Sequence, residues 1–152
     1  MHQFFLHIHS YWRWLVLVSM LIIVLKSIIG YKSNSDYNSK DATLRKVTVS
    51  ILHIQFILGS IIYSFSPLVK TFFKNISENI HEREIRFFAI EHSLMMLIAI
   101  VIVTIGAVKV KKQPDIKLQH KTTYVWFSIA LIIILLNIPW EFSPLVNRPS
   151  FR

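Results

Sequence analysis

The chain has 152 residues, of which 53% are hydrophobic, and its 17 lysines and arginines outnumber its 8 acidic residues. The absence of cysteine excludes a disulfide scaffold, a cysteine-ligated zinc site and covalent haem attachment through Cys-x-x-Cys-His. Only three glycines occur and no phosphate-binding glycine motif is present, which argues against a nucleotide-binding fold. Long stretches of about 20 residues with almost no charge instead predict membrane-spanning helices.

Four such stretches predict an all-α fold, a transmembrane four-helix bundle that forms a single domain over residues 1–152. The predicted spans are residues 4–29, 47–68, 85–108 and 122–140. We interpret the first as a spanning helix and not as a signal peptide. No small-residue cleavage site follows it, and no lysine or arginine precedes it.

A short interfacial helix is predicted between the second and third spans. Ser66 followed by Pro67 is typical of a helix cap with proline in the first helical position. Phe72, Phe73 and an isoleucine on each following turn then recur at helical spacing, opposite charged residues. This pattern suits a helix that lies along the membrane surface.

Most of the basic residues flank the two polar connections, residues 31–43 and 109–121. The positive-inside rule places both connections in the cytoplasm and both termini outside. The same rule explains the positive net charge, so we expect the lipid bilayer as a partner and no nucleic acid.

Three of the seven histidines, His9, His53 and His92, lie within or at the edge of predicted spans. An ionisable residue inside a membrane is a candidate functional residue. At about 100° per residue, His53 shares a face with Ser60 and Ser64, and this polar stripe is expected to face the bundle. His92 shares a face with small and apolar residues, Phe88, Met96, Ala99, Val103 and Gly106.

Imidazoles that converge in a bundle suit non-covalent haem b, whose iron takes one or two axial nitrogens. Arg13 and Arg86 are candidates to pair with the haem propionates. Glu91, Gln55 and Met96 are expected to support the ligands. Copper or non-haem iron is a second possibility, because imidazole suits both metals, and a quinone pocket is a third.

Depth in the membrane favours one pair of histidines. With a rise of about 1.5 Å per residue, His9 and His92 lie at a similar level near one boundary, and His53 lies past the midplane. A pair of His53 and His92 requires a tilt or an offset of the helices. Each histidine could also be a hydrogen-bonded packing residue, and His120 is expected to be solvated.

One segment in each predicted helix carries a resemblance to a known family. The segments are His9–Trp14, Leu52–Gln55, Arg86–His92 and Ile138–Trp140. They resemble small bacterial four-helix integral membrane proteins that are often labelled cytochrome b-like. The resemblance spans nearly the whole chain and implies a haem-binding electron-transfer protein, with His9, His53 and His92 as candidate axial ligands. Glu141 stands where a second proline is expected, and a tail over residues 142–152 is appended.

These observations favour a b-type cytochrome that transfers electrons in a membrane redox chain, between a quinol and another redox subunit. Two alternatives stay open: a non-catalytic subunit or assembly factor of a larger membrane complex, and a copper- or iron-handling membrane protein. A homodimer is also expected to be possible, because a single four-helix bundle of this size has little internal space for a haem. A stand-alone enzyme is less expected, because no serine has a base in a recognisable arrangement and Glu91 and Glu141 are separate singletons.

Overall fold

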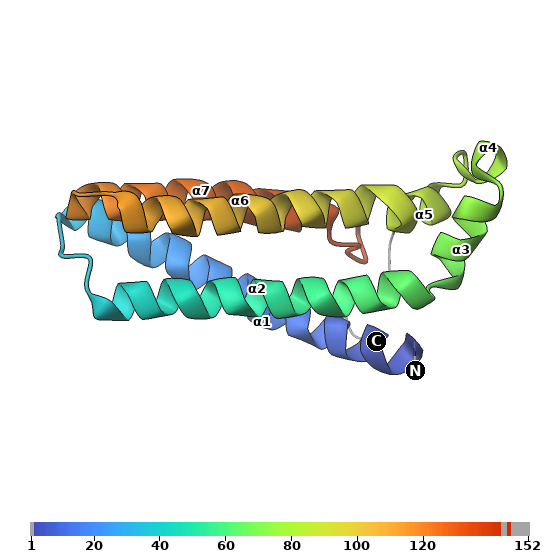
Figure 1. Ribbon diagram of the computed structural model, residues 1–152, viewed down its shortest axis with the longest axis horizontal. Coiled ribbons are helices and arrows are strands. Elements are labelled where there is room, and N and C mark those ends of the chain that lie inside the picture. The colour runs from blue at the N-terminus through green and yellow to red at the C-terminus, as the bar shows by residue number, and fades with distance from the viewer. Residues whose placement is uncertain (1, 144–145, 147–152) are drawn as a thin grey trace.

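The structure is a computed structural model that describes residues 2–143 and residue 146. Four long antiparallel helical segments run along the molecule, and a cluster of short helices lies at one end (Figure 1). In chain order the elements are α1 (His2–Ser33), α2 (Ser39–Phe65), α3 (Pro67–Lys74), α4 (Ile76–Asn79), α5 (Arg83–Arg86), the π-helix η1 (Phe87–Glu91), α6 (His92–Lys112) and α7 (Ile116–Asn137). The described residues contain no β-strand, so the predicted all-α fold is confirmed.

All four long segments could cross a bilayer. They are α1, α2, the 30-residue run from α5 through η1 to α6, and α7. The chain is therefore a multi-pass membrane protein. The second and fourth predicted spans extend past the ends of their helices, because α2 ends at Phe65 and α7 ends at Asn137. In both places a proline follows within two residues and disfavours continuation of the helix.

Each long helix packs against two neighbours, so the order around the bundle is α1, α2, α6 and α7. The core lies mainly between α1, α6 and α7, where Met20, Val103, Phe127 and Ala130 are completely buried. The second helix is the least covered: 11% of its apolar window is buried, against 39% in α1. Toward its N-terminus, α1 diverges from α6 and α7 and lies beside α2 (Figure 1).

The predicted burial of the polar stripe on α2 is wrong. Ser60 and Ser64 are exposed on the surface of the bundle. Each serine hydroxyl donates to a carbonyl one turn earlier in its own helix at 2.9 Å, so exposure to lipid leaves no hydroxyl proton unpaired. The buried residues of α2 are all in its first half, at Asp41, Arg45, Thr48 and Leu52.

The predicted interfacial helix begins as expected but is shorter. Ser66 caps α3, and its hydroxyl accepts the backbone N–H of Val69 at 3.4 Å. Val69 and Phe72 are buried, whereas Phe73 is exposed. The helix ends at Lys74, and Asn75 after it has a non-helical backbone, so the predicted apolar stripe is divided between α3 and the separate turn of α4.

Two short loops close the opposite end of the bundle, residues 34–38 between α1 and α2 and residues 113–115 between α6 and α7. We call this the loop end, and the end where α1 begins and α7 stops is the terminal end. Of the appended tail, residues 144–145 and 147–152 lie outside the described residues.

Candidate functional site

His92 is held at the terminal end by a hydrogen bond that crosses between two helices. Its Nδ1–H donates to the backbone carbonyl of Asn137 at 2.8 Å. That carbonyl belongs to the last turn of α7, where no helical N–H follows to pair with it. A carbonyl can only accept, so a neutral His92 keeps the lone pair of Nε2 available. The rings of Phe87 and Phe88 lie 5.7 and 6.2 Å from the imidazole and restrict its plane.

The π-helix η1 sets the direction from which His92 enters the bundle. The N–H of His92 bonds to the carbonyl of Phe87, five residues earlier, which inserts one extra residue into the helix. On α6 the predicted phase is correct, since Ala99, Val103 and Gly106 are buried. Before the π-turn the phase shifts, and Phe87 is buried in place of Phe88.

His9 approaches the same region from α1. The side-chain amide of Gln55 on α2 donates to the backbone carbonyl of His9 at 3.1 Å and lies 3.3 Å from its Nε2. The ring of His9 packs against Gly59, where an added Cβ would lie 3.2 Å from Cε1. His92 and Arg13 are both close enough to His9 to act on it electrostatically. We call these four polar residues, His9, Arg13, Gln55 and His92, the His9–His92 cluster.

Within the cluster, the uncharged pair His9 and Gln55 has two buried polar atoms without a hydrogen-bond partner in the part of the chain that the structure describes. They are Nδ1 of His9 and Oε1 of Gln55. Since the Gln55 amide donates to Nε2 of His9, a neutral His9 carries its proton on Nδ1. The cluster therefore holds one unused donor and one unused acceptor, a combination that a bound molecule or water can satisfy.

Within the cluster, Arg13 is held in place by aromatic rings. Its guanidinium carbon lies 5.6 Å from the ring centroid of Trp14 and 5.9 Å from that of Trp140. The two indoles meet edge-on at 6.0 Å. These contacts join the first half of α1 to the residues after α7, so both tryptophans pack within the protein.

Four predicted site residues, His53, Arg86, Glu91 and Met96, lie outside this cluster. His53 donates Nδ1–H to the carbonyl of Val49 at 2.8 Å, and its Nε2 lies 3.3 Å from the hydroxyl of Thr104 on α6. Arg86 pairs with Glu91 at 2.7 Å, so the predicted propionate partner and the predicted supporting acid are bound to each other.

Met96 packs against the central hydrophobic core. The structure thus brings His9 to His92, as their predicted depths indicate, and keeps His53 apart.

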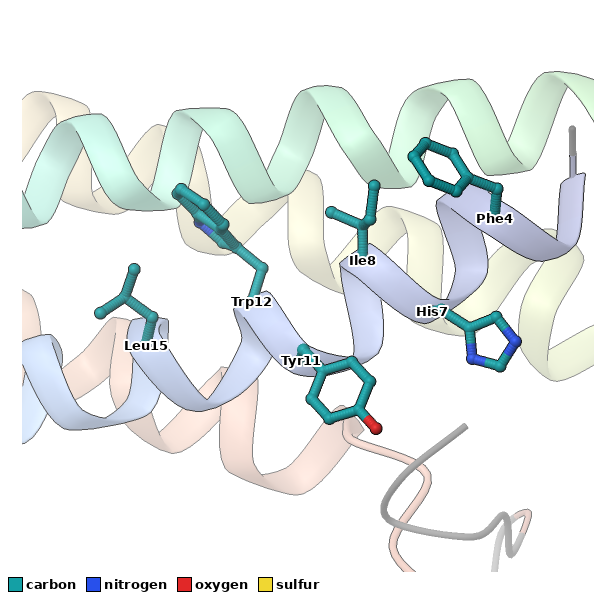
Figure 2. Close-up of a pocket in the computed structure, with 6 residues that line it drawn as sticks. All are labelled: Phe4, His7, Ile8, Tyr11, Trp12 and Leu15. Carbon is teal, nitrogen blue, oxygen red and sulfur yellow. The ribbon is translucent and has the colours of Figure 1, made fainter.

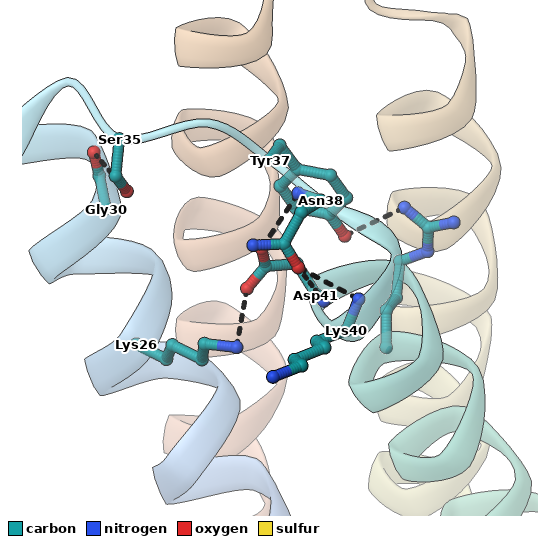
Figure 3. A network of polar contacts seen from close by, with 8 residues as sticks. Lys26, Gly30, Ser35, Tyr37, Asn38, Lys40 and Asp41 are labelled. Carbon is teal, nitrogen blue, oxygen red and sulfur yellow. Dashed lines mark hydrogen bonds and ion pairs between the residues drawn. The ribbon is translucent and has the colours of Figure 1, made fainter.

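A second polar cluster lies at the loop end and includes a residue whose predicted environment is wrong. His120, expected to be solvated, is 2% exposed, and its ring packs against Gly30 and 5.0 Å from the ring of Tyr37. Arg45 donates to the Tyr37 hydroxyl at 2.9 Å. Figure 3 shows the part of this network that includes Lys26 of α1, Asp41 of α2 and Tyr37 of the loop between them. The members of the network, which we call the Arg45–His120 cluster, are Lys26, Tyr37, Asp41, Arg45, Thr48 and His120.

Helical phase could have identified His120. It lies on one face with four buried residues of α7, Thr123, Phe127, Ala130 and Ile134. The predicted span begins at residue 122, two residues after this histidine, whereas α7 begins at Ile116. The side chain of Tyr37 has no comparable signal, because a loop conformation determines where it lies.

A shallow groove of about 420 Å³ runs along the surface of α1 near the terminal end (Figure 2). It is lined by Phe4, His7, Ile8, Tyr11, Trp12 and Leu15. The indole N–H of Trp12 donates to the carbonyl of Ile51 at 3.1 Å and ties this part of α1 to α2. None of the polar residues of the two clusters lines this groove.

Comparisons of the chain with protein families, with curated proteins and with solved structures found no match. Within the described part of the chain, no group of three or more histidine or acidic side chains is placed to hold a metal ion.

Proposed function

We propose that this protein is a b-type cytochrome-like electron carrier that binds haem at the His9–His92 cluster. The observation that carries the proposal is the bond from Nδ1–H of His92 to the Asn137 carbonyl at 2.8 Å. Ligating histidines commonly donate their second ring N–H to a backbone carbonyl, which fixes the tautomer and directs the other nitrogen to the metal. His92 is therefore the first candidate for the axial ligand.

The number of nitrogen ligands favours haem over a non-haem metal. A protein site for zinc, copper or non-haem iron needs three or four side-chain ligands in most cases, whereas haem iron takes one or two. The His9–His92 cluster offers two imidazoles. Haem supplies one-electron transfer when bound, and the residues of the chain determine its position, its burial and the charge around it.

Each neighbour has a defined part in this proposal. His9 is the second candidate ligand, and Gln55 orients its ring by binding both its carbonyl and its Nε2. Ligation through Nε2 requires that the Gln55 amide moves from that nitrogen. Arg13 provides a positive charge beside the histidines, where a propionate can bind. Arg86 is less suited to this role, because Glu91 already neutralises it.

The test is the absorption spectrum of the detergent-purified protein with and without added haem. A Soret band that shifts on reduction with dithionite is expected for the unmodified chain. His92→Gln should abolish or strongly alter that band. The matched control is His53→Gln, which removes a histidine of the same bundle that lies between α2 and α6, and its spectrum should stay unchanged.

Three results would contradict the haem proposal. An unchanged spectrum in His92→Gln would eliminate that residue as a ligand. A colourless protein with stoichiometric copper or iron would support a metal-handling protein instead. A colourless and metal-free protein would support the subunit or assembly-factor alternative.

The exposed surface of α2 favours that last alternative as the second candidate function. The helix is sparsely buried, and Ser60, Ser64 and Thr104 of the neighbouring α6 are exposed there. Small and polar residues on a membrane helix favour close packing with another helix. A second copy of the chain, or another membrane redox subunit, could cover this surface, and a quinone is the expected electron donor or acceptor in the membrane.

We place the protein in a bacterial inner membrane with the loop end in the cytoplasm and both termini outside. The lysine-rich connections at the loop end support this orientation through the positive-inside rule. A reporter enzyme that is active only outside the cytoplasm, fused after Arg152, should be active. Activity of a cytoplasm-specific reporter at the same position would overturn the orientation and leave the haem proposal untouched.

A further inference from the structure

The Arg45–His120 cluster carries a positive charge that its own acid does not balance. Lys26 pairs with Asp41 at 2.8 Å, which neutralises both. Arg45 is only 4% exposed, and among the described residues no carboxylate lies within ion-pair distance of it. Burial raises the pKa of the Tyr37 phenol, so the hydroxyl that binds Arg45 stays neutral and supplies no compensating charge. A buried guanidinium without an anion is energetically costly.

The same cluster contains three buried polar atoms that have no hydrogen-bond partner in the described part of the chain. They are both ring nitrogens of His120 and the hydroxyl of Thr48. Thr48 is completely buried and lies three residues beyond Arg45 on the buried face of α2. Tyr37, in the loop between α1 and α2, contacts both Arg45 of α2 and His120 of α7, so it links these two residues.

The position of the cluster along the predicted spans indicates which anion surrounds it in the membrane. Arg45 lies two residues before the predicted apolar span 47–68, and His120 lies two residues before the span 122–140. Both therefore stand where the hydrocarbon core gives way to the lipid headgroups. Phosphate is the anion of that layer, and arginine binds its oxygens through a planar pair of N–H donors. Of the charged side chains of the cluster, that of Lys26 is 45% exposed and lies at its solvent or lipid edge, whereas that of Arg45 is buried.

We propose that the Arg45–His120 cluster is a binding site for a phosphate group. The guanidinium of Arg45 binds the phosphate oxygens, and the hydroxyl of Thr48 and an N–H of His120 supply further donors. The phosphate can be inorganic or can belong to a lipid headgroup, since both present the same oxygens. The site is separate from the His9–His92 cluster and does not depend on haem.

The first arm of the test uses inorganic phosphate on the full-length protein in a phosphate-free maltoside detergent. Phosphate should raise the midpoint of thermal unfolding relative to chloride at equal ionic strength, because a ligand that binds only the folded state stabilises it. Arg45→Lys keeps the charge but loses the planar donor pair, and it should weaken phosphate binding about tenfold. Lys46→Gln is the control, because it removes a charge from the next, exposed position and should leave binding unchanged.

The second arm uses bilayer nanodiscs of phosphatidylglycerol and nanodiscs of a phosphate-free glycolipid. A higher unfolding midpoint in phosphatidylglycerol, lost in Arg45→Lys and kept in Lys46→Gln, identifies a lipid phosphate. A response to inorganic phosphate alone identifies the free ion. His120→Gln should weaken whichever response is found.

Two outcomes overturn the proposal. One is the absence of any phosphate-dependent shift of the unmodified protein in both arms, which can be read even if a variant fails to fold. The other is an equal response of Arg45→Lys and the unmodified protein, which would show that the cluster only packs the loop end together.

Discussion

Two histidines of this protein each pack against a glycine of a neighbouring helix, at opposite ends of the bundle and in different surroundings. His120 lies against Gly30, where a Cβ would come within 2.4 Å of the ring, beside a cationic network closed by the loop of residues 34–38. His9 lies against Gly59 with more room, beside an amide and a second histidine.

The comparison shows that burial of a histidine in a membrane protein is a poor guide to its chemistry. What distinguishes the two ends is the direction of lone pairs and the balance of charge. At the terminal end, the Asn137 carbonyl takes one N–H of His92 and leaves the other nitrogen available, as a metal ligand requires. At the loop end, Arg45 brings an unbalanced positive charge, as an anion site requires.

Replacing Gly30 should have the largest effect on stability. In Gly30→Ala the new methyl group would overlap the ring of His120 inside a packed interface. Overpacking of this kind costs about 1–3 kcal/mol, and the unfolding free energy in detergent should fall by about that amount. The double variant Gly30→Ala with His120→Ala should recover part of the loss. A fully stable single variant would show that the two helices are not held at this distance.

Asp41 should have the next largest effect. Asp41→Ala removes the ion pair with Lys26 and the bond at 2.9 Å from the N–H of Asn38, which completes the cap of α2. Loss of a cap with a partly exposed ion pair costs about 1–2 kcal/mol. Asp36→Ala in the exposed loop is the control, and chemical unfolding should show little change in it. Equal losses in the two variants would contradict a buried network at the loop end.

Gln55→Leu tests the terminal end in the same way. The change removes the two hydrogen bonds to His9, and its cost should be about 1 kcal/mol, close to the net value of one hydrogen bond. The hydroxyl of Ser60 bonds only within α2 among the described contacts, so Ser60→Ala on the exposed surface is the matched control. If both variants have the same stability and the same histidine resonances by NMR, Gln55 does not orient His9.

Gly59→Ala should have the smallest effect and sharpens the contrast between the two glycines. The added methyl group would lie 3.2 Å from the ring of His9, which a small movement relieves. The helix gains about 0.5–1 kcal/mol when glycine becomes alanine, so the net change in unfolding free energy should be near zero. The expected signature is a shift of the His9 ring resonances. A loss as large as that of Gly30→Ala would show that both ends are equally tight.

Much of the fold follows from the sequence because apolar length and helical phase are local properties. The four spans and the buried face of α6 that includes Ala99 and Gly106 are examples. The depth of a residue in the membrane is also a local property, since it is counted in residues from the end of a span. His9 and His92 have similar predicted depths and lie close enough to interact electrostatically.

Three features could not be predicted from local sequence patterns, because they depend on how helices and loops pack. The loop places Tyr37 over His120, and no periodicity describes a loop. The serines of α2 satisfy their own hydroxyls, so their polarity does not force them inward. The π-turn before His92 shifts the helix phase by one residue, which fixed 100° steps do not anticipate.

The bond between His92 and Asn137 has a consequence for the order of folding. It joins the first residue of α6 to the last residue of α7, at the open end of a hairpin whose turn is residues 113–115. Closure of such a hairpin from its turn brings near pairs together at the smallest entropic cost and the two free ends last. The Nε2 nitrogen of His92 is therefore oriented only when the whole α6–α7 hairpin has formed, so the proposed haem ligation depends on the last contact of that hairpin.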